Sequence, residues 1–163
     1  MTGEITGEIL RAPLALILGG LLLSAGIEDA RTREIADGKS IAIALLAPLW
    51  WWANGASAWP GVPIQLAIGL VTFVGFAVAF EFGMMGGGDV KLLAALSLWL
   101  PFTQWTAMLV AMSLAGGVVT LAMLVHHRRL HPGGQAPVEV PYGVAIAAAG
   151  LLALREPILN QFA

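Results

Sequence analysis

Long apolar runs with few charged residues recur along almost the whole chain, and they constrain the fold more than any other feature. The polar connections between them are too short to enclose a hydrophobic core of their own. The runs are apolar without alternation, which favours membrane-crossing helices over the strands of a β-barrel. Only 11% of the residues are charged, against about 25% in a typical globular protein. The sequence therefore predicts an all-α, polytopic membrane bundle that forms a single domain over residues 1–163.

Six runs are candidates for helices that cross a hydrocarbon core about 30 Å thick. The first, third and fifth are long enough to span it alone. The second and fourth are short, so we expect them to tilt, to be extended by their flanks, or to insert only in part. The six segments are residues 10–27, 40–53, 62–82, 89–100, 103–125 and 141–159.

Among the connections between these segments, only alternate ones carry positive charge, and each terminus carries one further arginine, Arg11 and Arg155. The second and fourth connections carry no Lys or Arg, whereas the first, third and fifth do. By the positive-inside rule the first, third and fifth connections are cytoplasmic, and both termini lie outside. The residues concerned are Arg31, Arg33 and Lys39 in the first connection, Lys91 in the third, and Arg128 and Arg129 in the fifth.

The tryptophans agree with this topology. All six fall near the predicted outer ends of segments two to five, where an interfacial aromatic belt is expected. They are Trp50, Trp51, Trp52, Trp59, Trp99 and Trp105.

Several chemistries are excluded by composition. The chain has no cysteine, which excludes disulfides, a thiol nucleophile and a cysteine-based zinc site. No basic run indicates a nucleic-acid partner, and no cofactor is expected. His126, His127 and His131 lie in a basic connection with Pro and Gly, a setting more typical of a solvated loop than of a metal site. The first apolar run follows the acidic stretch "MTGEITGE", so we expect no cleaved signal peptide.

Two acidic residues are brought to the same membrane face by this topology. Asp29 follows the first segment and Asp89 opens the fourth, so both lie at the predicted cytoplasmic boundary. Two carboxyl groups held close together cannot both ionise cheaply, so one keeps a proton. The ionised member can take a proton from a water that attacks a peptide carbonyl, while the protonated member hydrogen-bonds the carbonyl oxygen. The pair thus suits an aspartic protease.

Three glycines, Gly86, Gly87 and Gly88, stand directly before Asp89. Without Cβ atoms they let the backbone bend and let a substrate strand approach closely. Irregular backbone at membrane depth is tolerated where it lines a wet cavity. Two charged residues nearby are candidates for supporting roles. Glu81, near the end of the third segment, either tunes the acid pair or pairs with Lys91, which is itself either a site residue or an interface residue whose amine reaches the water.

Simpler interpretations of both acids remain open. Asp89 after a glycine turn is a good N-cap for an apolar helix. Asp29 stands in a mixed-charge stretch of the kind usually found in solvated loops. A small ion- or proton-coupled transporter would also use membrane carboxylates, but we expect its acids near the midplane and an internal repeat, and neither is visible.

Three stretches resemble one protein family. "GGGDVKLLAAL", residues 86–96, fits a G-x-G-D signature and resembles a helix start in prepilin peptidases, the membrane aspartic proteases that process type IV pilin precursors. "DARTREI", from Asp29, is similar to the family's first catalytic region, and "VPYGVAIAAAG", residues 140–150, is similar to the last helix of its short members. Where the family usually has Pro-Asn, this chain has Ala36-Asp37. We expect Asp37 to cap the second helix as Asn would.

The resemblance implies that Asp29 and Asp89 are the catalytic pair of a bacterial inner-membrane peptidase, with no metal. It also implies a prepilin substrate with a short basic leader, cut at the cytoplasmic boundary just before its hydrophobic helix, commonly after a glycine. The bilayer and pilus-assembly machinery are the implied partners. Longer members carry a cysteine-containing cytoplasmic region and methylate the new N-terminus with S-adenosylmethionine. This chain looks like the short type that serves Flp (tight-adherence) pili, without methyltransferase activity.

Other assignments stay open beside this one. Presenilin-type proteases share G-x-G-D but place their first aspartate in a Tyr-Asp pair, whereas the only tyrosine here, Tyr142, precedes Gly143. A pilus-assembly membrane protein without enzymatic activity is a further alternative, although an intact acid pair argues against it.

Overall fold

The structure, a computed structural model, describes residues 2–130 and 142–159, and it describes side chains within residues 7–125 and 142–154. Over the described residues the chain forms six α-helices and no strand, which confirms the all-α prediction. The helices are α1 (Thr2–Thr32), α2 (Asp37–Ala53), α3 (Gly61–Glu81), α4 (Gly87–Ser97), α5 (Phe102–Leu130) and α6 (Tyr142–Leu159).

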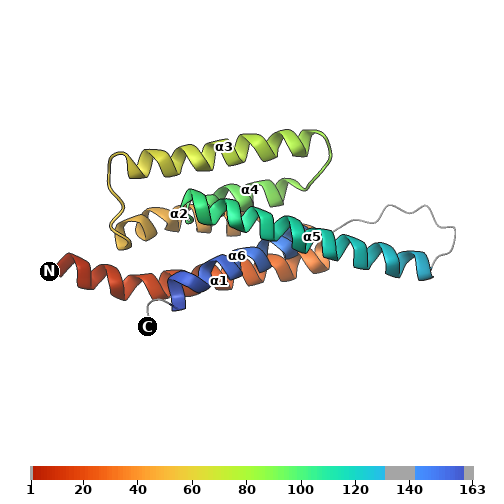
Figure 1. Ribbon diagram of the computed structural model, residues 1–163, viewed down its shortest axis with the longest axis horizontal. Helices are drawn as coiled ribbons and strands as arrows, with labels where there is room; N and C mark the ends of the chain where they lie inside the picture. Colours follow the sequence, from red (N-terminus) through yellow and green to blue (C-terminus); the bar gives the residue numbers. More distant parts are fainter. Residues whose placement is uncertain (1, 131–141, 160–163) are drawn as a thin grey trace.

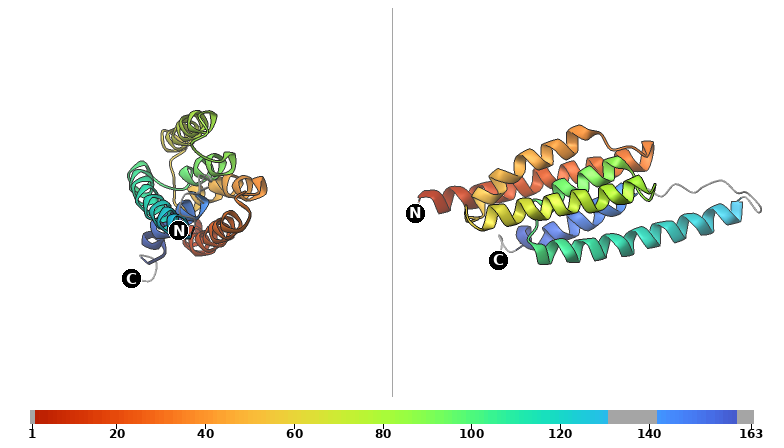
Figure 2. Two further views of the ribbon diagram at one scale, coloured as in Figure 1. Left: turned by 90° about the vertical axis from the view of Figure 1, so that its right-hand side faces the viewer. Right: turned by 90° about the horizontal axis from the view of Figure 1, so that it is seen from above.

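The short helix α4 lies at the centre of the bundle. It contacts α2, α3 and α6, and three of its leucines, Leu92, Leu93 and Leu96, are fully buried. The helices lie roughly side by side and alternate in direction, so the α1–α2 and α3–α4 connections meet at one end (Figure 1). Helix α3 packs on α4 and stands apart from α1 and α6 (Figure 2). This arrangement gathers the start of α4 and the end of α1 at the same end of the molecule.

Three helices are long and apolar enough to cross a membrane: Gly7–Thr32, Gly61–Glu81 and Phe102–Val125. Their outward faces carry large exposed apolar side chains, such as Leu70, Val71 and Leu114. A soluble monomer rarely exposes apolar surface on this scale, whereas lipid tails cover it without cost. These three helices are therefore candidate membrane spans, as expected for a polytopic membrane protein.

Helix α4 differs from these three because its 11 residues make it only roughly 16 Å long, about half the thickness of a hydrocarbon core. The neighbouring helices bury most of its surface.

Helix α1 extends beyond the apolar run predicted over residues 10–27. It continues through the polar residues Glu28 to Thr32, where the backbone hydrogen bonds of the helix are maintained. Asp29 was expected to follow the first helix, and instead it lies inside the last turn. The backbone around this carboxyl group is thus held by the helix.

Small residues let α1, α4 and α6 approach one another closely. A Cβ atom on Gly26 of α1 would lie 2.8 Å from Cβ of Ala147 in α6. A Cβ atom on Gly150 of α6 would lie 3.0 Å from methyl groups of both Leu22 and Leu96. Close approach through small residues is typical of helix packing in membranes, where packing replaces the hydrophobic effect as the driving force.

The tryptophans follow the predicted aromatic belt only in part. Trp50, Trp99 and Trp105 are buried in the protein core, so the prediction of an interfacial belt is wrong for these three. The rings of Trp50 and Trp99 stack with centroids 5.3 Å apart, and Trp50 Nε1 donates to the backbone oxygen of Trp99 at 3.0 Å. These contacts hold the C-terminal end of α4 against α2. Trp52 and Trp59 are exposed, as a belt requires.

Candidate active site

Asp29, in the last turn of α1, makes hydrogen bonds with two backbone N–H groups, one through its main chain and one through its side chain. The N–H of Arg33 donates to the backbone oxygen of Asp29 at 3.0 Å and closes the last turn, with Arg33 in the left-handed region at φ 60°. The Asp29 side chain is only 5% exposed. Its Oδ2 accepts a hydrogen bond from the backbone N–H of Val144, in the first turn of α6, at 3.3 Å. Asp29 is thus a buried carboxyl group that joins α1 to α6, and it does not lie in a solvated loop.

Asp89 is the third residue of α4. The helix begins after Gly86, which is extended (φ −75°, ψ 148°) and makes no side-chain cap. The interpretation of Asp89 as an N-cap is therefore wrong, because its carboxyl group lies within the first turn. The side chain is 7% exposed, and its Oδ1 is buried without a hydrogen-bond partner. A buried, unpaired carboxyl oxygen costs free energy, and such groups concentrate at functional sites.

Both aspartates line one cavity of about 220 Å³ at the end of the bundle. Such a volume corresponds to on the order of seven water molecules, enough for a nucleophilic water and a short stretch of peptide backbone. The prediction that Asp29 and Asp89 meet in space is consistent with this geometry. The cavity walls come from the end of α1, the α1–α2 turn and the start of α4: Asp29, Arg33, Glu34, Ile35, Gly86, Gly87, Gly88 and Asp89.

The three glycines allow close approach by the protein's own chain. A Cβ atom on Gly88 would lie 3.1 Å from Cβ and 3.2 Å from the oxygen of Ile35, in the α1–α2 turn. A Cβ atom on Gly86 would lie 3.2 Å from Oδ2 of Asp89. Gly88 therefore lets the turn lie against α4, and Gly86 leaves space beside the carboxyl group. We had expected all three to leave room for a substrate, but Gly88 is in contact with Ile35.

Burial changes the acid–base behaviour of Asp89, which lies outside the three long apolar helices. Loss of solvation, and secondly the neighbouring Asp29 charge, raise the pKa of Asp89, a backbone hydrogen bond from Gly86 partly opposes the rise, and the resulting pKa is about 6. A carboxyl group with such a pKa is partly protonated near neutral pH, and it can donate a hydrogen bond to a developing oxyanion.

The two predicted supporting residues lie elsewhere. Lys91 Nζ forms an exposed salt bridge with Asp37 at 2.7 Å, and Glu81 is exposed at the end of α3. Neither is among the residues that line the aspartate cavity. Asp37 is the first residue of α2, whose N-cap is Ala36 without a side-chain hydrogen bond. The expectation that Asp37 caps this helix is therefore wrong, because its carboxylate pairs with Lys91 instead.

The α1–α2 turn is fastened by a second ion pair. Glu28 Oε2 accepts hydrogen bonds from Lys39 Nζ at 2.7 Å and from the backbone N–H of Ala36 at 3.1 Å. Lys39 Nζ also donates to the backbone oxygen of Ser24 at 3.0 Å. These bonds hold the turn that carries Ile35 and thus shape one wall of the cavity.

Sequence reasoning missed the contact between α6 and Asp29. The backbone N–H of Val144, in the first turn of α6, donates to the carboxyl group of Asp29. The signal available in the sequence was the likeness of residues 140–150 to the last helix of a peptidase family, although this stretch is far from Asp29 and Asp89 along the chain.

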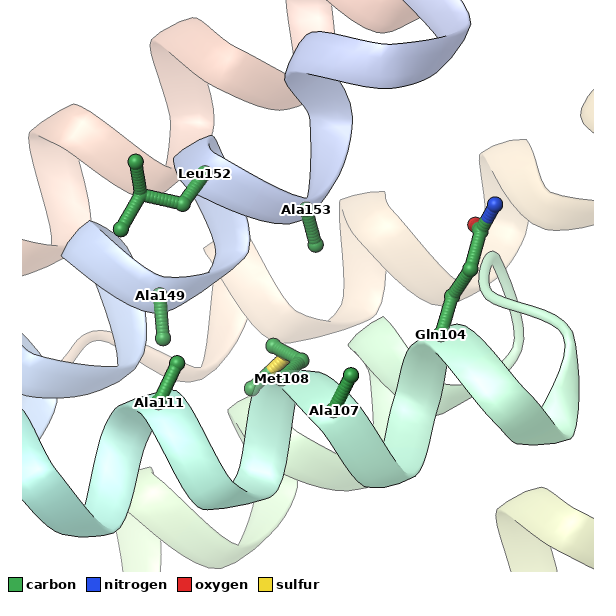
Figure 3. A pocket seen from close by; sticks show the side chains of 7 residues that line it. All are labelled: Gln104, Ala107, Met108, Ala111, Ala149, Leu152 and Ala153. Atoms are coloured by element: carbon green, nitrogen blue, oxygen red, sulfur yellow. The ribbon is translucent and has the colours of Figure 1, made fainter.

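Three other cavities of the described residues lie away from the aspartates, and the smallest of them, about 250 Å³, lies among the tryptophans Trp50, Trp51 and Trp99. A groove of about 540 Å³ between α2 and α3 lies on the face of α4 that carries Lys91. A cavity of about 300 Å³ between α5 and α6 is nearly all apolar (Figure 3) and contains no titratable group. The side chains of His126 and His127, and the whole of His131, lie outside the described residues. The residues around the α5–α6 cavity are Gln104, Ala107, Met108, Ala111, Ala149, Leu152 and Ala153.

Comparison with known protein families gives one result that agrees with this geometry. Residues 16–121, well over half of the chain, match the type IV leader peptidase family. The match includes both aspartates, the α1–α2 turn and the glycines before α4. No curated protein and no solved structure matches the chain. The chain therefore belongs to the type IV leader peptidase family, and this membership makes it a prepilin peptidase, a hydrolase.

Proposed function

We propose that Asp29 and Asp89 are the catalytic pair of this peptidase. The observation that carries the proposal is that both buried carboxyl groups line one cavity at the same end of the bundle. Their environments differ in a way that suits acid–base work: Asp29 accepts a backbone hydrogen bond, and Asp89 Oδ1 has no partner. Pairs of titratable groups whose environments separate their proton affinities supply the acid and the base of a reaction.

The reaction proceeds by attack of water on the scissile carbonyl carbon. The ionised carboxylate takes a proton from the water as the new C–O bond forms, and the protonated carboxyl group donates a hydrogen bond to the carbonyl oxygen as it gains charge. The tetrahedral intermediate then collapses, the C–N bond breaks, and a carboxyl group of the pair gives its proton to the leaving nitrogen. One proton shared by two carboxyl groups is thus enough for a full cycle.

The proposed substrate is the precursor of an Flp-type pilin with a basic leader, cut just before its hydrophobic helix. The likeness of "VPYGVAIAAAG" to the short members of the family supports this subtype. The chain has no cysteine, whereas the methylating members carry cysteines in a cytoplasmic region, so we propose a peptidase without methyltransferase activity. The glycines Gly86 and Gly87 then leave the cavity open to the substrate backbone.

The proposed location is the bacterial inner membrane, with the cavity at the cytoplasmic face, both termini outside, and pilus-assembly proteins as partners. All six helices belong to one domain in this proposal. Helix α4 starts at the cytoplasmic boundary and ends within the bundle, surrounded by the longer helices. Irregular backbone, such as the glycine stretch before α4, is tolerated at membrane depth when it lines a cavity.

The test is co-expression of the peptidase with candidate prepilins, followed by measurement of the precursor's size. The wild type should shorten its prepilin, and Asp29→Asn and Asp89→Asn should each reduce the rate by at least about 10³-fold, since a unit with a missing member loses nearly all its catalysis. Glu81→Gln, which changes an exposed carboxylate outside the cavity, is the matched control and should cleave at the normal rate. Normal processing by either aspartate variant would rule out the two-aspartate mechanism.

A further inference from the structure

The two aspartates have unequal surroundings, and the inequality comes from α6. The first turn of a helix has backbone N–H groups without partners inside the helix, and they favour a negative charge. Asp29 lies against this turn: the N–H of Val144 donates to its Oδ2 at 3.3 Å, and the N–H of Gly143 faces the same carboxyl group. Asp89 is buried in the same cavity as Asp29, with one carboxyl oxygen unpaired and a single backbone hydrogen bond, from Gly86, that favours its charged form. The helix terminus therefore favours negative charge on Asp29.

Gly143 makes this contact sterically possible. A Cβ atom at this position would lie 2.8 Å from both Cβ and Cγ of Asp29, and 2.7 Å from Cδ1 of Ile35. Real Cβ atoms almost never come this close to another atom, so a side chain at 143 would displace Asp29. The absence of a side chain at Gly143 thus sets where the carboxyl group lies.

The remaining charged groups around Asp29 leave this difference in place. Arg33, just beyond the end of α1, favours a negative charge there. The two other acidic residues that line the same cavity are Glu34 in the turn and Asp89 on α4. Lys39 of α2 is paired with Glu28, and Asp37 of the same helix is paired with Lys91. The described side chains of α5, residues 102–125, include no titratable group, and the ring of Tyr142 packs on Gly116 of that helix.

We propose that the N-terminus of α6 holds Asp29 as the ionised member of the pair, which accepts the proton of the attacking water, and that Gly143 is a positioning residue for it. Asp89 then carries the proton that hydrogen-bonds the substrate carbonyl. This assignment rests on the proposed catalytic role of the two aspartates. It gives a function to a segment that lies beyond residues 16–121, the part that matches the peptidase family.

The first test compares Gly143→Ala with Gly150→Ala in the full-length protein in detergent or vesicles, using as substrate the uncleaved prepilin that the wild type processes. Both variants add one methyl group to α6, and at Gly150 the nearest atoms are two leucine methyl groups at 3.0 Å. Gly143→Ala should lower kcat by at least about 100-fold, because a displacement of about 1 Å in a catalytic group has an effect of that size. Its KM should stay within about threefold, whereas Gly150→Ala should keep kcat within about threefold.

The second test removes the donor without adding bulk next to Asp29. Val144→Pro deletes the N–H at a position in the first helical turn where proline is tolerated. Because that N–H favours the carboxylate, the acidic limb of the pH–kcat profile should move to higher pH by about one unit. Val144→Ala shortens the side chain but keeps the N–H, so its acidic limb should stay at the wild-type position whatever its rate.

The outcomes separate this inference from the proposed function. A wild type that cleaves no prepilin, or an active Asp29→Asn variant, would contradict the proposed catalytic pair. If the wild type is active and both aspartate variants are dead, but Gly143→Ala keeps its kcat, the positioning role is wrong. If Gly143→Ala does not fold, the profile of Val144→Pro still decides, and an unmoved acidic limb would overturn the assignment of Asp29 as the base.

Discussion

A buried carboxyl group with an unpaired oxygen is costly, and Asp89 shows that cost directly. Its pKa is raised from 3.8 to about 6, so the folded state binds its proton more tightly than the unfolded state does. Its contribution to stability is therefore fully present below about pH 4 and is lost as the pH rises to about 6. Above that range the ionised group destabilises the fold by on the order of 3 kcal/mol.

We therefore expect Asp89→Asn to be inactive but more stable than the wild type at pH 8. The neutral amide avoids the cost of burying a charge, and the apparent unfolding temperature in detergent should rise by several degrees. Below pH 4 this charge-dependent advantage should disappear, because Asp89 is then protonated as well. Glu81→Gln, at an exposed position, serves as control and should show no such difference. A destabilised Asp89→Asn at pH 8 would contradict the assignment of Asp89 as an ionisable buried group.

Arg33 is a second residue whose conformation carries a cost. Its φ of 60° lies in the left-handed region that non-glycine residues avoid at a cost of about 1–2 kcal/mol. Arg33→Gly should raise the free energy of unfolding by about 1 kcal/mol, since glycine adopts this conformation freely. Arg31→Gly, inside the exposed last turn of α1, should lower it by a similar amount. Thermal unfolding of both variants checks the two signs, and a destabilised Arg33→Gly contradicts the prediction.

Residue positions could be predicted from the sequence where topology alone decides them. Asp29 and Asp89 were expected on one face because two intervening segments run out and back, and both line the cavity. Side-chain pairing was not predictable to the same degree. Lys91 had several acids within reach of its predicted place, and the choice of Asp37 depends on the rotation of α2 and α4 about their axes. Helix rotation is set by packing in three dimensions, which apolar runs do not encode.

At the scale of elements, the α1–α2 turn is the connection on which the site most depends. Glu28 bonds both Lys39 and the N–H of Ala36, and the turn between them carries Ile35 against Gly88. Loss of the Glu28 side chain frees the Ala36 amide and the Lys39 amine at the same time. The turn should then open more often, because local opening is governed by the few bonds that hold a segment.

Glu28→Ala should therefore speed hydrogen exchange at the Ala36 amide by at least about tenfold. Glu28→Gln keeps an acceptor oxygen without the charge, so its exchange rate at the Ala36 amide should fall between those of Glu28→Ala and the wild type. Glu8→Ala, on an exposed position of the same helix, is the control. Mass spectrometry of a peptide that covers residues 33–38 gives the measurement. Unchanged protection in Glu28→Ala would mean that the turn is held by other contacts.

The number of helices was predictable from apolar runs, but their ends were less so. Helix α1 continues through "EDART" because none of these residues breaks a helix. The apolar run marks only where the surface facing lipid or core ends, so it stops before the last backbone hydrogen bonds of the helix. The buried tryptophans were missed for a related reason. Aromatic residues near the ends of segments suit both an interface and a core, and only the neighbouring elements decide between them. The rings of Trp50, on α2, and Trp99, just after α4, stack on each other in the core.

At the scale of the whole molecule, the distribution of Lys and Arg agrees with the alternating directions of the helices. The α1–α2 connection and the start of α4 lie at the same end of the bundle (Figure 1). The first carries Arg33, the second is followed by Lys91, and both contribute residues to the aspartate cavity. The connection at Asn54, which carries no Lys or Arg, lies at the opposite end. From the positive-inside rule we propose that this basic end is cytoplasmic, which would turn the cavity toward the side on which a prepilin leader is made.

Reporter fusions after Asn54 and after Gly133 test this orientation. A phosphatase that works only outside the cytoplasm should be active after Asn54 and inactive after Gly133, and a fluorescent protein that folds only in the cytoplasm should give the reverse pattern. Replacing Arg31, Arg33 and Lys39 with glutamine removes every Lys and Arg from the first connection, so it should produce a population with mixed orientation. Reporters on the same side after both residues would overturn the alternating six-helix topology. If instead the phosphatase is active after Gly133 and inactive after Asn54, and the fluorescent protein shows the reverse, the aspartate cavity lies outside.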